Sequence, residues 1–297
     1  MLTKKDINHI AAELGFSAAY CIAASEADAV PAGIRTMILL TRDYKPCNGL
    51  VDAFYPCSNA AYHAASGMIR VLKERYGVHA GRLNEVKVKS VCSRIPAFGR
   101  GKNTLNYLPG TGSRFCAEMI GISEEITDDE GKCFPAELLP CDSCNRCRSA
   151  CPTGAITEHG FNKEKCIRFH MLSGKPMPEE FRGFIGTVPG VHAILGCGVC
   201  QRACPANSGD GSGQDAEEPY SISDYLALSD IMLAEFADRY GKNYANRNRI
   251  LAQAALAAGN SGDISLIPLL ERLLASNSET VAEHARWAID RLISQNQ

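Results

Sequence analysis

The sequence lacks three features that would place it in a special class of protein. No apolar run approaches the roughly 18–20 residues that a membrane-spanning helix needs. The first residues lead into a mixed amphipathic stretch, without the apolar core of a signal peptide. The formal net charge is only −2, which gives no support to extensive nucleic-acid binding but is compatible with a local basic patch. We therefore expect a cytoplasmic protein without a membrane partner.

Cysteine, in contrast, is plentiful, with 14 among the 297 residues. Thiols stay reduced in the cytoplasm, so metal binding explains this number better than a disulfide framework does. The remaining composition, with 45% hydrophobic and 22% charged residues, is typical of a globular protein. The length predicts two or three folded units.

The N-terminal part, residues 1–135, is predicted to be an α/β domain. Residues 5–14 have apolar side chains at helical spacing, whereas residues 36–41 form an apolar run that fits a buried strand. Residues 86–91 alternate apolar and polar side chains, which predicts a half-exposed strand. Residues 96–113 are dense in Gly, Asn and Pro and are predicted to be a long functional loop.

The C-terminal part is predicted to be a helical cap. Residues 208–219 are rich in Gly and Ser and read as a flexible linker before it. Within residues 220–297, two segments, 264–275 and 280–293, carry apolar residues three and four apart. Paired helices of this length suggest a HEAT-like repeat.

Between these parts, residues 136–207 carry the cysteine pattern of bacterial two-cluster ferredoxins. Cys141, Cys144, Cys147 and Cys151 form C-x2-C-x2-C-x3-C followed by proline. Three cysteines at intervals of three residues wrap a tight loop around one face of an iron–sulfur cube, and the fourth thiolate points to a second cluster. The fold class is therefore α+β: an α/β domain, a ferredoxin-like module with two [4Fe–4S] clusters, and a helical cap.

A second cysteine group completes the ligand count. Cys197, Cys200 and Cys204 again end in Cys-Pro, and Cys166 lies between the two groups at the start of a predicted helix. The predicted ligands are Cys141, Cys144, Cys147 and Cys204 for cluster 1, and Cys151, Cys166, Cys197 and Cys200 for cluster 2. Zinc is the alternative, but zinc motifs usually pair two separate C-x2-C knuckles.

Six cysteines remain outside these sets: Cys21, Cys47, Cys57, Cys92, Cys116 and Cys133. Free cysteine usually behaves as a small buried apolar residue, which is what we expect for them. Cys92 and Cys116 lie near the predicted loop, so a functional role is the alternative for these two.

The cysteine segment and its surroundings resemble the epoxyqueuosine reductases, the cobalamin-dependent iron–sulfur enzymes of tRNA queuosine synthesis. The specific matches are residues 141–156, 166–167, 174–179 and 196–207 in the cluster segment, and 247–249, 257–263 and 283–288 in the tail. The resemblance therefore touches nearly the whole chain, and its middle and tail are the most specific parts.

This resemblance implies a cobalamin held between the N-terminal domain and the cluster module. The residues that match family pieces there are Gly101, Lys102, Asn103, Gly112 and Ser113, which are the predicted cobalamin contacts. In the family, reduced cobalt drives removal of an epoxide oxygen while a carboxylic acid supplies a proton, which is general acid catalysis. The implied partners are tRNA and a reduced donor such as ferredoxin or flavodoxin, and we expect a monomer.

The family's acid has no counterpart here. The family carries an aspartate where this sequence has Lys89 or Ser90. Two hypotheses follow: a cobalamin-dependent reductase, or a non-catalytic electron carrier or binding protein that kept the cluster module. A weaker third is a reductase of another substrate, such as a halogenated compound.

A cluster of basic residues lies at residues 239–249, next to the helical tail, with two tyrosines between its members. Its members are Arg239, Lys242, Arg247 and Arg249. Such a cluster predicts contacts with RNA phosphates. The alternative is the ordinary solvated face of a surface helix.

Overall fold

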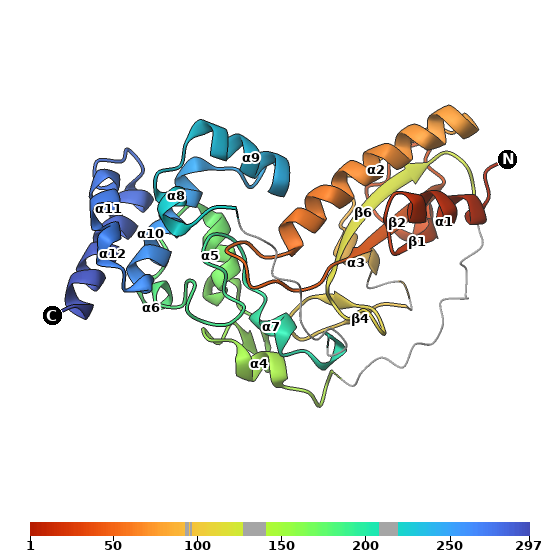
Figure 1. Ribbon diagram of the computed structural model, residues 1–297. Coiled ribbons are helices and arrows are strands. Elements are labelled where there is room, and N and C mark those ends of the chain that lie inside the picture. The colour runs from red at the N-terminus through yellow and green to blue at the C-terminus, as the bar shows by residue number, and fades with distance from the viewer. Residues whose placement is uncertain (93–94, 96, 127–140, 208–218) are drawn as a thin grey trace. The chain divides into compact units, whose positions relative to one another are not determined.

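The computed structural model describes residues 1–92, 95, 97–126, 141–207 and 219–297. Within them the chain forms two compact units (Figure 1). Unit 1 comprises residues 1–45, 56–144 and 205–209, and unit 2 comprises residues 46–55, 145–204 and 210–297. The domain boundary predicted at residue 135 and nearly all of the predicted linker fall outside the described residues, so both stay predictions.

Unit 1 is built on an antiparallel four-stranded sheet with the strand order β1-β2-β6-β3. Its strands are β1 (Ala18–Ala23), β2 (Thr36–Asp43), β3 (Ala80–Arg82) and β6 (Phe115–Ile122). In the register, Leu39 of β2 is paired with Tyr20 on one side and Met119 on the other. Because β2 is an inner strand, its first six residues are buried on both faces, as the apolar run at residues 36–41 predicts.

Two helices pack beside this sheet, α1 (Lys4–Glu13) and α2 (Phe54–Tyr76). Thr3 begins α1 as a capping box, because its hydroxyl accepts the Asp6 N–H (3.2 Å) while the Asp6 carboxylate accepts the Thr3 N–H (2.9 Å). A Cβ atom at Gly67 of α2 would lie 3.4 Å from Leu14, so the end of α1 packs against α2. The helix predicted at residues 5–14 is confirmed.

The strand predicted at residues 86–91 is wrong. The segment forms a short helix, α3 (Val88–Cys92), in which the Val91 N–H donates to the Lys87 carbonyl at 3.1 Å. Val88, Val91 and Cys92 stand at i, i+3 and i+4, so one helical turn places all three against the apolar cluster beneath the sheet. Over so few residues, alternation and helical spacing give the same pattern.

The segment predicted as a long loop contains a small antiparallel pair within its described part. Strands β4 (Gly99–Arg100) and β5 (Asn106–Tyr107) pair in antiparallel register. Gly99 is required there because a Cβ atom would lie 2.2 Å from the Tyr107 ring. The pair fixes the turn between its strands.

Unit 2 is mainly helical. Its helices are α4 (Arg146–Ala150), α5 (Ile167–Ser173), α6 (Glu179–Arg182), α7 (Val199–Arg202), α8 (Ile222–Leu226), α9 (Asp230–Tyr240), α10 (Arg247–Ser261), α11 (Ile267–Leu273) and α12 (Glu279–Gln295). A two-stranded hairpin, β7 (Ile156–Thr157) and β8 (Gly160–Phe161), and short 3-10 turns, η2 (Lys163–Lys165) and η4 (Ile264–Leu266), lie between them. The helices predicted at residues 264–275 and 280–293 are present, the first as η4 continued by α11.

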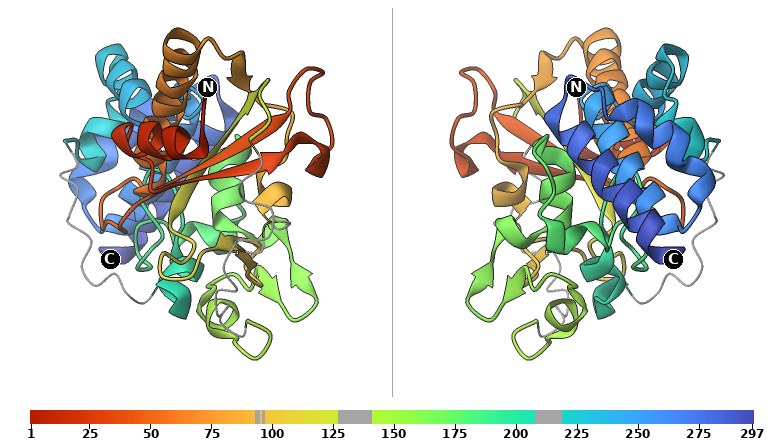
Figure 2. Two further views of the ribbon diagram at one scale, coloured as in Figure 1. Left: turned by 90° about the vertical axis from the view of Figure 1, so that its right-hand side faces the viewer. Right: turned by 90° about the vertical axis from the view of Figure 1, so that its left-hand side faces the viewer.

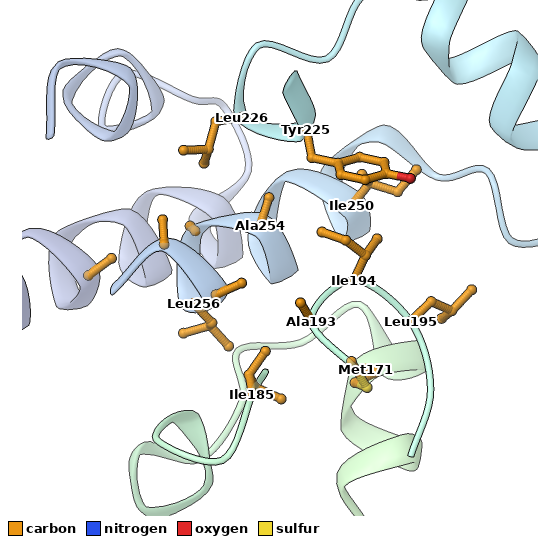
Figure 3. Packing of buried hydrophobic residues seen from close by; sticks show 14 of the residues in the cluster. Met171, Ile185, Ala193, Ile194, Leu195, Tyr225, Leu226, Ile250, Ala254 and Leu256 are labelled. Atoms are coloured by element: carbon orange, nitrogen blue, oxygen red, sulfur yellow. The ribbon is translucent and has the colours of Figure 1, made fainter. Parts of the chain in front are cut away.

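Helix α10 is the centre of the core of unit 2. It is buried on most sides, and Figure 3 shows its Ile250 and Leu256 among apolar side chains that include Ile194 of the cysteine segment. Helices α10 and α12 run alongside each other (Figure 2, right view). At their closest approach a Cβ atom on Gly259 would lie 2.7 Å from the Ala288 Cα, so glycine allows the contact. No helix in the described parts of the chain is long and apolar enough to span a bilayer.

A buried histidine joins α12 to the segment between Cys166 and Cys197. His284 Nε2 accepts the Met177 N–H (2.9 Å), and Nδ1 lies 3.0 Å from the Ala252 carbonyl and donates to it. This pattern needs neutral imidazole with the proton on Nδ1. Burial lowers the pKa of His284 from 6.5 to about 4.

We predict that unit 2 loses stability on acidification through His284. Below pH 6.5 His284 binds a proton in the unfolded chain, whereas in the folded chain it stays neutral down to about pH 4. The loss should reach about 1 kcal/mol by pH 5.5. The measurement is denaturant unfolding at pH 7 and pH 5.5, followed by the fluorescence of Trp287, which is the single tryptophan.

His284→Leu is the matched variant, with His159→Leu, an exposed histidine, as control. The His284 variant should be less stable at pH 7 by about 1–3 kcal/mol, because two buried backbone groups lose their partner. Its deficit against the unmodified chain should shrink at pH 5.5. An unchanged deficit would contradict the linkage.

Candidate iron–sulfur site

The first cysteine group lies on a tight turn followed by helix α4. The Cys144 N–H donates to the Cys141 carbonyl at 3.1 Å, which closes the turn in unit 1. In unit 2, Cys147 is buried on α4, and Cys151 ends this helix by donating its N–H to the Arg148 carbonyl at 3.3 Å. The short cysteine intervals thus form the tight turn that the spacing predicts, followed by a short helix that it does not predict.

Unit 2 gathers Cys151 with three cysteines from farther along the chain. Cys166 is the N-cap residue of α5, as predicted, and Cys200 lies on α7, just after Cys197. Burial and, after it, the neighbouring thiols of Cys200, Cys166 and Cys151 raise the pKa of the Cys197 thiol to about 12. These four thiols are therefore close enough to interact electrostatically.

Such a group of thiols fits a metal cluster by its chemistry. Neighbouring cysteines are stable together as thiolates when bound cations compensate the charge, and metal binding releases their protons. Four thiolates are the usual ligand set of one [4Fe–4S] cluster. No three His, Cys, Asp or Glu side chains of the described residues converge as closely as the ligands of a single metal ion do.

A glycine and an aspartate fix the approach to Cys197. Gly196 has a φ of +113°, in the region that favours glycine. A Cβ atom at Gly196 would lie 2.4 Å from the Asp52 side chain, so no other residue fits. Asp52 in turn donates its N–H to the Leu195 carbonyl at 2.8 Å. The segment at residues 46–55, which also forms a β-bridge from Val51 to Leu195, thus supports the second cysteine group.

The turn that carries the predicted cobalamin contacts Gly101, Lys102 and Asn103 is directed at the first cysteine group. The Lys102 N–H donates to Cys141 Sγ at 3.3 Å, and Lys102 Nζ donates to the Asp142 carbonyl at 2.8 Å. Sequence reasoning missed this contact, since nothing local signals a bond between residues 39 positions apart.

The other predicted cobalamin contacts, Gly112 and Ser113, bind the end of the cysteine segment. The Ser113 N–H donates to Asn207 Oδ1 at 2.7 Å, and Asn207 Nδ2 donates to the Ser113 hydroxyl at 3.1 Å. A Cβ atom on Gly112 would lie 1.9 Å from Asn207 Oδ1. The five residues thus have protein partners, and their contact with a corrinoid stays a prediction.

The residues at the family's acid position are exposed. Lys89 and Ser90 lie on the outer side of α3, whereas Val91 and Cys92 of the same helix are buried. A carboxylate is present at neither position, and the sequence already says so.

The predicted RNA-binding residues divide into two pairs. Arg239 and Lys242 are exposed. Arg247 pairs with Asp230 (2.5 Å), and Arg249 donates to the Asn243 carbonyl (2.8 Å), so both stabilise unit 2.

The remaining described cysteines differ from one another. All thirteen cysteines that the structure describes are free thiols, and Cys133 lies outside the described residues. Burial raises the pKa of Cys92 to about 12 and raises that of Cys47 as well. A hydrogen bond with Cys116 instead holds the pKa of Cys57 below its ordinary value, a pairing that the sequence does not signal.

Comparison with known proteins agrees with the cysteine assignment. The sequence model of the "4Fe-4S double cluster binding domain" family matches residues 140–207. The epoxyqueuosine reductase of Lactococcus garvieae (strain Lg2) is 32% identical over 207 residues, which are 66% of this chain and 56% of that protein. That of Bacillus subtilis (strain 168) is 32% identical over 221 residues, 70% of this chain and 54% of that protein.

The chain spans about half the length of these curated relatives. Among solved structures, an epoxyqueuosine reductase with an epoxyqueuosine-modified tRNA stem loop has a TM-score of 0.74 at 20% identity, over 97% of this chain and 90% of that chain. This likeness confirms the mixed helix-and-sheet fold.

The chain is therefore an iron–sulfur protein with a double-cluster domain, and its two predicted [4Fe–4S] clusters follow from that domain. Within this class, it is a relative of the epoxyqueuosine reductases, as the sequence resemblance predicts.

We predict that Cys197→Ala removes one of two clusters. The anaerobically reconstituted chain should carry about eight irons, and the variant about four, because one cluster loses a thiolate. Iron and sulfide analysis measures this. Cys92→Ala, which removes a buried thiol outside the ligand sets, should keep all eight. Stoichiometric zinc in place of iron, or equal iron in both variants, would contradict the assignment.

Proposed function

We propose that this chain is an iron–sulfur reductase that passes electrons through two [4Fe–4S] clusters to a tRNA-borne substrate of the epoxyqueuosine type. The observation that carries the proposal is the gathering of Cys151, Cys166, Cys197 and Cys200 within a segment that matches a double-cluster domain. Two neighbouring clusters allow one-electron steps over a short path, and the relatives named above supply the substrate class.

The proposed ligand sets keep the exchange typical of two-cluster ferredoxins. Cluster 2 takes the four thiols gathered in unit 2. Cluster 1 is assigned on spacing alone, to Cys141, Cys144, Cys147 and Cys204. Each cluster thus takes one cysteine from the other half of the motif, so neither half can hold its cluster without the other.

A corrinoid is the proposed electron acceptor of the clusters. When bound, it supplies a strongly nucleophilic metal centre. The proposed contacts remain Gly101, Lys102, Asn103, Gly112 and Ser113, of which Lys102 and Ser113 donate hydrogen bonds to the cysteine segment. In this proposal, these hydrogen bonds hold the wall of the cofactor site in place.

The missing proton donor supports a second candidate function. Converting an epoxide to an alkene consumes two electrons and two protons and releases water. The exposed Lys89 and Ser90 offer no carboxylate at the family's acid position. This favours, as a second candidate, a non-catalytic electron carrier that keeps both clusters. In either case we propose a ferredoxin or flavodoxin as donor and a monomeric chain.

The basic residues of the helical tail are the proposed tRNA contacts. We assign this role to Arg239 and Lys242, which are exposed. Arg247, through its ion pair with Asp230, and Arg249, through its hydrogen bond to the Asn243 carbonyl, hold the segment that carries them. We further propose that helices α8 to α12 form a HEAT-like repeat that presents these side chains.

We predict that the anaerobic chain, given a chemical reductant and cobalamin, removes one oxygen from an epoxyqueuosine-modified tRNA stem loop. Mass spectrometry of the nucleoside measures the product. Cys197→Ala should be inactive, because its electron path is broken. Unchanged substrate together with clusters that still accept electrons would reject the reductase and support the carrier.

We predict that Arg239→Ala with Lys242→Ala weakens stem-loop binding. Each lost phosphate contact should reduce the slope of log K against log salt by about 1. Filter binding or anisotropy at several salt concentrations measures it. The charge-matched control is Lys73→Ala with Arg75→Ala in the last turn of α2. Equal losses in both double variants would show that overall charge alone is responsible.

A further inference from the structure

The turn between β4 and β5 has a backbone shape that few sequences allow. The Gly101 N–H donates to the Leu105 carbonyl (2.8 Å), and the Thr104 N–H donates to the Gly101 carbonyl (2.9 Å). Thr104 has a φ of +63°, which is rare for a β-branched residue. A Cβ atom at Gly101 would lie 2.5 Å from Asn103 Oδ1. The surrounding bonds therefore hold the turn in one conformation.

Asn103 closes this turn from inside. Its side chain is buried, and its Oδ1 accepts the Leu105 N–H at 3.2 Å. The β4–β5 pair holds both ends of the turn, with Arg100 opposite Asn106. Lys102 is consequently presented on a rigid support, which is how groups that tune a cofactor are held in position.

Lys102 makes three contacts with the turn of the first cysteine group. Its N–H donates to Cys141 Sγ at 3.3 Å, and its ammonium donates to the carbonyls of Asp142 (2.8 Å) and Cys144 (3.2 Å). One residue thus places both a hydrogen-bond donor and a full positive charge next to two predicted ligands of cluster 1. All of these residues lie in unit 1.

We propose that Lys102 is a positioning residue that raises the reduction potential of cluster 1 relative to a chain without it. Reduction adds one negative charge to the cluster and its thiolates. A donor to a ligand sulfur and a nearby cation both stabilise that charge, and hydrogen bonds and net charge are known determinants of cluster potential. The proposal rests on the proposed ligation of cluster 1 by Cys141 and Cys144.

The role favours electron acceptance at the cluster that lies beside the β4–β5 turn. A higher potential makes this cluster the easier of the two to reduce, other influences being equal. Unequal potentials of the two clusters decide which of them holds a single electron for most of the time. Lys102 supplies such an inequality because its amide and ammonium both contact the turn that holds Cys141 and Cys144.

The test is a redox titration of the anaerobically reconstituted full chain, followed by electron paramagnetic resonance. The unmodified chain should contain about eight irons and show two midpoint potentials. Lys102→Met should lower one midpoint potential. The expected change is about tenfold in the equilibrium constant for reduction, which equals about 59 mV for one electron. The other potential should stay unchanged, and so should both in Lys73→Met.

Lys102→Gln separates the charge from the support of the turn. Glutamine can still donate to the two carbonyls, so Lys102→Gln should retain all the iron even if Lys102→Met loses some. Because glutamine lacks the positive charge, Lys102→Gln should still lower one midpoint potential. Two variants with full iron and unshifted potentials would overturn the proposal. So would an equal shift of both potentials, or the same shift in Lys73→Met. An unmodified chain without iron would refute the proposed cluster function itself.

Discussion

Neighbouring cysteines can be held together as thiolates only if positive charge compensates them, and the arrangement of unit 2 depends on this constraint. Burial, and to a lesser extent the neighbouring thiols of Cys200, Cys166 and Cys151, raise the pKa of Cys197 to about 12. Iron binding reverses this preference, because the bound ions stabilise the thiolates and displace the protons. The protein must therefore bring these cysteines together by other interactions, and it does so with the apolar core beside them.

That core explains why residues 145–204 and the helical tail form one unit. Ile194 and Leu195, just before Cys197, pack in the cluster of buried residues that surrounds α10. Polar contacts join the same two parts of the chain. Arg182 forms an ion pair with Glu283 of α12 and donates to the Met177 carbonyl at 2.9 Å. The 30 residues between Cys166 and Cys197 are thus held by helices near the end of the chain. The tail supports the metal site even before any role in RNA binding is considered.

The parts of the structure that the sequence predicts are those set by neighbours in the chain. The cysteine intervals predict the tight turn at Cys141 and Cys144, and the prediction of Cys166 at the start of a helix, α5, is confirmed. The prediction for residues 86–91 failed because so short a segment does not separate an alternating pattern from a single helical turn. The bonds of Lys102 to Cys141 and of Ser113 to Asn207 join residues 39 and 94 positions apart. No periodicity encodes such pairs, since they follow from tertiary packing.

These two long-range bonds also bear on what the glycine-rich turns can do for a cofactor. A backbone N–H has one proton to donate, and that of Lys102 is already directed at Cys141 Sγ. A ligand that accepts a hydrogen bond from this N–H therefore competes with Cys141 Sγ for it. If Cys141 ligates cluster 1, as proposed, binding at the β4–β5 turn and the potential of this cluster are thermodynamically linked, and the linkage is reciprocal. Reduction of the cluster strengthens the bond from Lys102 to sulfur, and thereby weakens the binding of any competing acceptor at the same turn.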